Sequence, residues 1–306
     1  MALGRTGKTL RQMRRDNAFY LAMAPFVVIF LIFSVFPVLF SFYLGFNQWD
    51  GFSEPRFVGF ENYLRALNDP VFQKAIWNTI YLWFWSSVVT VTLALGLAVL
   101  VNEYVAFGKN WFRMVFLLPL LVAPAIAAII LRVFFTSSGG LVNLFIGSIT
   151  GTPSYFDWLG SQEWIKPLVA LLVVWRWTGW YMIIFMAGLQ SIPRDIYEAA
   201  RIDGVGRWAI FSRITVPLLM PSIAFAVITA TLGGLQMFDE PYVLTQGLGG
   251  TNNSTTTIGM YLYATAFTQF NFGLGSAVSW YIFAAVVVLT LSYRFLNQRM
   301  REGAGA

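Results

Sequence analysis

Several long stretches of this sequence contain no charged side chain. Three of them lie between Asp16 and Asp50, between Lys74 and Glu103, and between Arg213 and Asp239. Each stretch is long enough to cross about 30 Å of hydrocarbon at about 1.5 Å per helical residue. Hydrophobic residues make up 58% of the 306 residues, which is more than a water-soluble globule of this length can bury in one core. The surplus apolar surface must therefore face lipid.

Six spans are predicted, at about residues 19–46, 75–101, 113–135, 167–190, 214–237 and 274–294. Only helices and closed barrels satisfy every backbone hydrogen bond in lipid, and these runs lack the alternation of a barrel strand. We therefore expect an all-α, polytopic membrane protein with about six transmembrane helices. The first run is too long for a signal peptide and predicts a retained helix. No internal repeat or linker is evident, so residues 1–306 are interpreted as a single transmembrane domain.

The distribution of Lys and Arg predicts the orientation of these spans. With the N-terminus inside, the N-terminal tail (residues 1–17), the inner loops and the C-terminal end hold fourteen Lys and Arg residues. The outer loops 47–74, 136–166 and 238–273 hold four. Because inner loops carry the excess of basic residues, we expect a basic cytoplasmic tail and both termini in the cytoplasm.

The composition excludes several kinds of chemistry. The chain has no Cys and no His, which removes thiol nucleophiles, imidazole bases and the usual zinc ligands. Gly7-Lys8-Thr9 resembles the end of a phosphate-binding loop, but the required first glycine falls on Ala2 and no strand can precede it. We expect no metal, no cofactor and no enzymatic activity, so any ATP hydrolysis must occur on another chain.

The predicted inner loop 191–217 differs from an ordinary connector because it carries helix start and stop signals. Pro193 suits a first helical turn, Asp195 favours the positive end of a helix dipole, and Gly204 is a natural C-terminal stop. A second helix is expected from about Arg207 to Val216. The sequence therefore predicts two short helices across the cytoplasmic mouth.

This loop resembles the EAA loop of the inner-membrane permeases of binding-protein-dependent ABC importers. The matching residues are Glu198, Ala199, Ala200, Asp203, Gly204, Ile214 and Pro217. Ile192-Pro193 and Tyr197 are similar to the carbohydrate branch, which includes the maltose, lactose and glycerol-phosphate permeases. The resemblance extends to residues 57–63 (FVGFENY) and to the Gly-rich stretch before the last span. Val216, where the pattern usually has Leu, is a conservative departure.

The resemblance implies a MetI-like, type I ABC importer permease fold and a set of partners. Those partners are a second homologous permease, a cytoplasmic ATPase dimer, an extracytoplasmic solute-binding protein and a carbohydrate. It further implies that loop 191–217 docks on the ATPase and that alternating access moves the substrate through a bacterial inner membrane. Ala199 and Ala200 permit close approach of a partner. An amphipathic helix resting on lipid headgroups is the other interpretation of this loop.

Two sets of residues are candidates for the substrate pathway. Arg176 lies inside a span beside Trp175 and Trp180, and aromatic faces with a guanidinium suit a sugar. An aromatic belt with Arg176 paired inside the bundle remains the alternative. The fifth span contributes a second set, for whose glycines close helix packing is the other interpretation. This set consists of Gly233, Gly234, Gln236 and Met237.

Two functional alternatives remain. A self-sufficient secondary transporter of a small polar solute would need carboxylates within its spans and normally an internal repeat. Asp239 and Glu240 are expected only at the outer end of the fifth span. A membrane enzyme or receptor would need an active site that is hard to assemble without His, Cys or an acidic pair.

Overall fold

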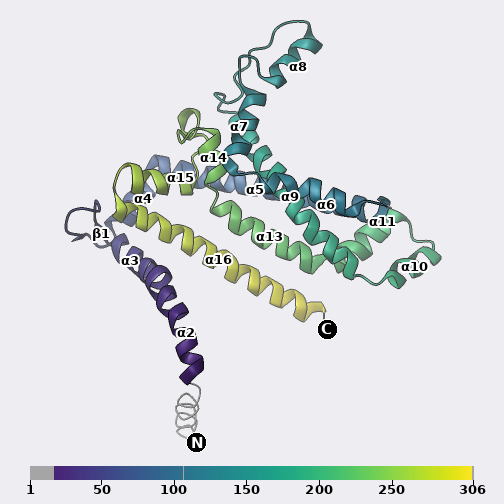
Figure 1. Ribbon diagram of the computed structural model, residues 1–306, viewed down its shortest axis with the longest axis horizontal. Helices are drawn as coiled ribbons and strands as arrows, with labels where there is room; N and C mark the ends of the chain where they lie inside the picture. The colour runs from purple at the N-terminus through teal and green to yellow at the C-terminus, as the bar shows by residue number, and fades with distance from the viewer. Residues whose placement is uncertain (1–16, 106, 305–306) are drawn as a thin grey trace, which may run out of the picture.

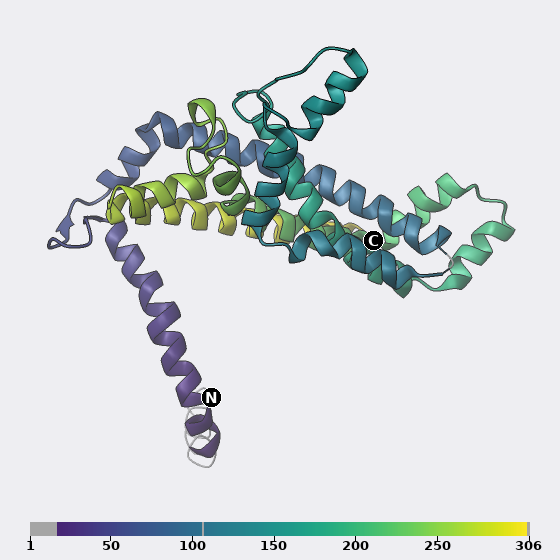
Figure 2. The same cartoon turned by 45° about the horizontal axis from the view of Figure 1, so that its top comes forward.

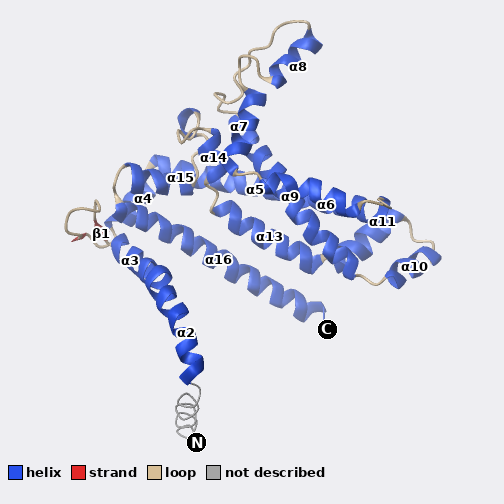
Figure 3. Cartoon of the chain, in the orientation of Figure 1, coloured by secondary structure: helices blue, strands red, loops and turns tan. Residues whose placement is uncertain are grey.

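The computed structural model describes residues 17–105 and 107–304, and helices form most of this part of the chain (Figure 3). Four helices are long and apolar enough to cross a membrane alone: Tyr20–Gly45, Pro70–Tyr104, Ile165–Ser191 and Phe272–Tyr293. Two bent pairs of helices provide two more spans if each pair is counted as one. The all-α membrane fold with about six transmembrane helices is thus confirmed. Residues 1–16 of the predicted basic tail lie outside the described residues.

The order of the elements follows the chain through the spans. The first half contains α2 (Asn17–Phe30), η1 (Leu31–Val35), α3 (Phe36–Gly45), β1 (Asn47–Gln48), β2 (Arg56–Phe57), α4 (Glu61–Asn68), α5 (Pro70–Tyr104), α6 (Lys109–Leu121), α7 (Pro124–Phe135) and α8 (Leu141–Thr150). The second half contains α9 (Ile165–Ser191), α10 (Arg194–Ile202), α11 (Arg207–Ile210), η2 (Phe211–Thr215), α12 (Val216–Leu218), α13 (Met220–Leu235), α14 (Asp239–Leu244), η3 (Thr251–Asn253), α15 (Ile258–Tyr263), η4 (Ala264–Thr268) and α16 (Phe272–Ala304). β1 and β2 pair antiparallel.

Two of the predicted spans are broken and not continuous. The span predicted at 113–135 consists of α6 and α7, which meet at 94°. The helix Arg207–Leu218 meets α13 at 66°. Pro119 and Pro124 flank the first break, and Pro217 and Pro221 flank the second. Each proline removes a backbone donor and obstructs the preceding turn, so the helix ends or bends there. The segment predicted as outer loop 136–166 also contains a helix, α8.

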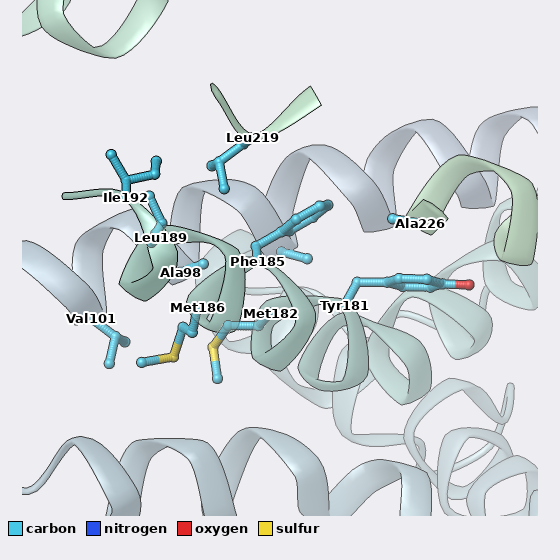
Figure 4. Packing of buried hydrophobic residues seen from close by; sticks show 11 residues of the cluster. Ala98, Val101, Tyr181, Met182, Phe185, Met186, Leu189, Ile192, Leu219 and Ala226 are labelled. Atoms are coloured by element: carbon cyan, nitrogen blue, oxygen red, sulfur yellow. The ribbon is translucent and has the colours of Figure 1, made fainter. Parts of the chain in front are cut away.

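Helix α9 is the centre of the bundle, with α5, α6 and α13 packed along it (Figures 1 and 2). One buried cluster joins residues of α5, such as Ala94 and Ala98, to Met182 and Phe185 of α9 and to Ala226 of α13 (Figure 4). The alanines let the backbones approach, as is usual where helices pack in lipid. Gly179 serves the same purpose against α6, since an added Cβ there would overlap the carbonyl of Phe116.

The first helix leaves the bundle at an angle (Figure 1). Within its spanning window none of the residues is buried. Its final turn is anchored to α16, where Phe42 and Trp280 pack with ring centroids 4.8 Å apart. Its remaining apolar surface is consistent with a helix that faces lipid or another membrane chain.

One end of the bundle, called the α15 end, is built from α4, α14, α15 and the loop between α14 and α15. This loop packs tightly against α5. Asn78 of α5 donates to the carbonyl oxygens of Asn253 and Thr256 at 2.8 and 2.9 Å. Residues 254–257 are buried, and the two carbonyl oxygens that accept from Asn78 are satisfied there without water.

Tyr261 locks α15 to the start of α5. Its hydroxyl donates to Asp69 Oδ2 at 2.7 Å, while Asp69 Oδ1 caps α5 by accepting from the backbone N–H of Val71. Burial, followed by this hydrogen bond to a carboxylate, raises the pKa of the Tyr261 hydroxyl. The hydroxyl therefore remains a donor throughout the neutral pH range.

Candidate functional site

A cavity of about 330 Å³ lies between α5, α9, α13 and α14. Most of its wall is apolar or uncharged, with hydroxyl groups and aromatic rings. We call it the central cavity, and its lining residues are Ser86, Ser87, Thr90, Pro124, Val173, Arg176, Trp177, Tyr181, Thr229, Ala230, Gly233, Gly234, Gln236, Met237, Phe238, Asp239 and Glu240. Such a mixture of rings and hydroxyls suits a polar organic solute and not a bare ion.

Helix α9 presents one face to the central cavity. Arg176, Trp177 and Tyr181 belong to the lining, as expected for positions separated by about one helical turn. The predicted candidates Trp175 and Trp180 are not among the lining residues, and 42% and 43% of their surfaces are exposed. A role for these two tryptophans in the substrate pathway stays a prediction, whereas Trp177 is the tryptophan that the fold brings to the cavity.

Arg176 forms an ion pair across the cavity wall. Its Nη1 donates to Glu240 Oε1 at 2.6 Å, and the two side chains are 8% and 10% exposed. This is the only salt bridge among the residues that the structure describes. It ties the middle of α9 to the start of α14, 64 residues away. Glu240, expected only at the end of the fifth span, therefore lies in the wall of the central cavity.

The end of α13 forms the facing wall. All four predicted residues of this segment, Gly233, Gly234, Gln236 and Met237, line the central cavity. The two glycines differ, because a Cβ on Gly234 would lie 2.5 Å from the Trp83 side chain, whereas a Cβ on Gly233 would meet nothing within 4 Å. Gly234 thus permits close packing of α13 on α5, and Gly233 leaves space in the cavity.

The segment 191–217 forms a projecting hairpin of helices at the opposite end of the bundle, the α10 end (Figure 1). Helix α10 stops where the sequence predicted. Gly204 has φ +73°, its N–H donates to the Arg201 carbonyl at 3.1 Å, and the Val205 N–H donates to the Ala200 carbonyl at 3.0 Å. This pair of bonds satisfies the last carbonyls of the helix and requires a left-handed residue. The chain then reverses into α11.

The residues of this segment separate into an exposed and an inward set. Glu198, Ala199, Asp203, Gly204 and Pro217 are exposed, Ile214 is half-buried and Ala200 is buried. The inward set also contains Tyr197, whose hydroxyl lies 3.3 Å from Thr215 Oγ1 and whose side chain packs on the α5–α9–α13 cluster. Ile202 and Trp208 add large exposed apolar side chains to the projecting surface. The segment therefore combines an exposed face with an inward face that packs on the bundle.

Sequence reasoning missed several residues of the central cavity. Ser86 and Thr90 come from α5, Thr229 from α13, and Trp177 and Tyr181 from α9. An arginine inside a span signals that a partner is needed, but the sequence does not identify Glu240 as that partner, because it lies 64 residues away. Among the residues that the structure describes, no cluster of three or more acidic side chains is placed to hold a metal ion.

Comparison with known proteins places the chain among transport proteins. Residues 93–302 match the family model described as "Binding-protein-dependent transport system inner membrane component". The lactose transport system permease protein LacF of Rhizobium radiobacter is 37% identical over 285 residues, covering 92% of this chain and 94% of the relative. The trehalose/maltose transport system permease protein MalF of Thermococcus litoralis is 35% identical over 289 residues, covering 92% and 94%.

The fold is similar to that of a solved transporter chain. A chain from the crystal structure of a bacterial alginate ABC transporter, in complex with an alginate pentasaccharide-bound periplasmic protein, superimposes with a TM-score of 0.82. The match covers 95% of this chain and 97% of that chain at 23% sequence identity. This likeness confirms the permease fold that the sequence predicted.

Proposed function

This chain belongs to the family of binding-protein-dependent transport system inner membrane components, and from that premise we propose that it is the permease subunit of an ABC importer for a carbohydrate. The observation that carries the proposal is the central cavity. Its wall combines Trp177 and Tyr181 with the hydroxyls of Thr90 and Thr229. Flat rings stack on pyranose faces and hydroxyl groups exchange hydrogen bonds with a sugar. The names of the relatives, which include lactose, trehalose and maltose, support the same substrate class.

The exposed part of segment 191–217 is the proposed docking site for a cytoplasmic ATPase dimer. Glu198 and Ala199 lie exposed on α10, and the reversal at Gly204 keeps the helix short. Small side chains allow a partner to approach closely, and an exposed carboxylate can meet a cation of the partner. Because this chain has no phosphate-binding loop, ATP hydrolysis takes place on that partner.

Movement of α10 has a direct route to the central cavity. Tyr197 contacts Thr215 and packs on the cluster that joins α5, α9 and α13. Two of these helices, α9 and α13, form facing walls of the cavity. A displacement of α10 on ATP binding therefore shifts the walls themselves, which is the rigid-body route to alternating access.

The remaining assignments complete the assembly. A second homologous permease pairs with this chain, and an extracytoplasmic solute-binding protein delivers the carbohydrate at the α15 end. Residues 1–306 act as one transmembrane domain in the bacterial inner membrane, with both termini in the cytoplasm, as the excess of Lys and Arg favours. The apolar surface of the first helix supports pairing with another membrane chain.

Affinity purification of the tagged chain from its native membrane tests this proposal. We expect the chain to co-purify with an ATPase and a second permease, and the reconstituted complex to take up a carbohydrate only with ATP. Glu198→Lys should lower sugar-stimulated ATP hydrolysis by reversing the charge on the docking helix. Glu198→Gln, which removes the charge of the same side chain without reversing it, should lower the hydrolysis less and is the matched control. ATP-independent uptake by the isolated chain would refute the proposal in favour of a secondary transporter.

A further inference from the structure

The central cavity contains one cation, and that cation is already neutralised. The charged residues of its lining are Arg176, Glu240 and Asp239. Arg176 and Glu240 form the 2.6 Å ion pair, in which both side chains are at least nine-tenths buried. Asp239 is exposed to the cavity space and has no cationic partner among the described residues. The formal charge of the lining is therefore negative and not positive.

This arrangement disfavours an anionic solute. An anion could gain a charged partner only by taking Arg176 away from Glu240, which would leave the Glu240 carboxylate buried and unpaired. Leaving one member of a buried pair without its partner is strongly unfavourable. An anion that left the pair intact would lie beside Asp239 and Glu240 without a compensating cation, and like charges repel strongly where water is scarce.

The same wall still offers hydrogen bonds to an uncharged solute. Gln236 lines the central cavity and is exposed. Its side-chain amide can therefore both donate to and accept from a sugar hydroxyl without any change in the ion pair. Ser87 and Thr229 add half-buried hydroxyl groups to the same wall.

We infer that the Arg176–Glu240 pair determines the charge class of the substrate, so that the central cavity accepts an uncharged carbohydrate and rejects acidic ones. This inference rests on the proposed function, because it specifies the carbohydrate of the same site. Glu240 cancels the charge of Arg176, so the pair presents no free cation to a substrate. The cavity then rejects acidic sugars through repulsion of their charge as much as it selects neutral sugars through favourable contacts.

Calorimetric titration of the reconstituted permease–ATPase complex, without its solute-binding protein, tests the inference, because the central cavity is then the carbohydrate site under test. The neutral probes are lactose, maltose and trehalose, and the acidic probes are digalacturonate and an alginate disaccharide. The wild-type complex should bind at least one neutral probe at least ten-fold more tightly than either acidic probe. Glu240→Gln frees the charge of Arg176 and should move this ratio at least ten-fold toward the acidic probes. The Arg176→Gln/Glu240→Gln double variant removes both charges together and should keep the neutral preference.

Asp239→Asn is the matched comparison, since it removes one carboxylate from the same wall without unpairing Arg176. It should shift the ratio toward the acidic probes by less than Glu240→Gln does, because it releases no cation to the substrate. The inference is overturned if the wild-type complex prefers an acidic probe, or if Glu240→Gln shifts the ratio no further than Asp239→Asn does. Should Glu240→Gln fail to fold, loss of the neutral preference in the double variant overturns it equally. If no carbohydrate binds at all, the proposed function itself fails, which is a different result from tight binding of an acidic sugar.

Discussion

Replacing Gly204 with Ala isolates the backbone requirement of the docking segment. A Cβ at this position would meet nothing within 4 Å, so the substitution causes no steric overlap. The cost arises from the φ of +73°, because a left-handed conformation costs a residue with a Cβ about 1–2 kcal/mol. Gly206 is the matched control, since its surroundings are equally open but its φ is −68° and its ψ 154°. Ala at position 206 should be neutral or stabilising by about 0.4–1 kcal/mol.

Hydrogen exchange measures this difference directly. The amides of Gly204 and Val205 are protected by their bonds to the Arg201 and Ala200 carbonyls. A penalty of about 1–2 kcal/mol should accelerate their exchange by roughly 5- to 30-fold in Gly204→Ala, and Gly206→Ala should leave it unchanged or slower. Sugar-stimulated ATP hydrolysis should fall in the first variant only. Equal exchange in the two variants would show that the left-handed turn does not hold the end of α10.

Two further outcomes follow from exposure and packing. The chain contains no Cys, so a single introduced cysteine reports its own position. Leu248→Cys, 77% exposed at the α15 end, should react with an impermeant thiol reagent in intact cells, and Ser212→Cys at the α10 end should be protected. The reverse pattern would invert the proposed orientation. Gly179→Ala should lower the stability of the purified protein, measured by thermal unfolding, by about 1–3 kcal/mol, because the new Cβ overlaps the Phe116 carbonyl. Gly233→Ala is the control and should lower stability less, because its Cβ faces open space. An equal loss in both variants would contradict the packing argument.

Local properties of the chain were sufficient to predict much of this protein. The uncharged runs located the spans because transfer of apolar residues into lipid is additive along a helix. The stop at Gly204 could be predicted because a helix cap depends on neighbouring residues alone. Pro119 and Pro124 favour a break in the helix, but a proline does not fix the angle, and the 94° break between α6 and α7 depends on what each helix packs against.

Only the tertiary structure decided which residues line the central cavity. In a membrane both the lipid-facing and the core-facing sides of a helix are apolar, so the sequence lacks the polar stripe that fixes the rotation of a helix in water. Trp175, Trp177 and Trp180 lie within about one and a half turns, and the packing of α9 on α5 and α13 selects Trp177. The ion pair between Arg176 and Glu240 spans 64 residues. Its formation depends on the relative position of two helices, which no local pattern of residues encodes.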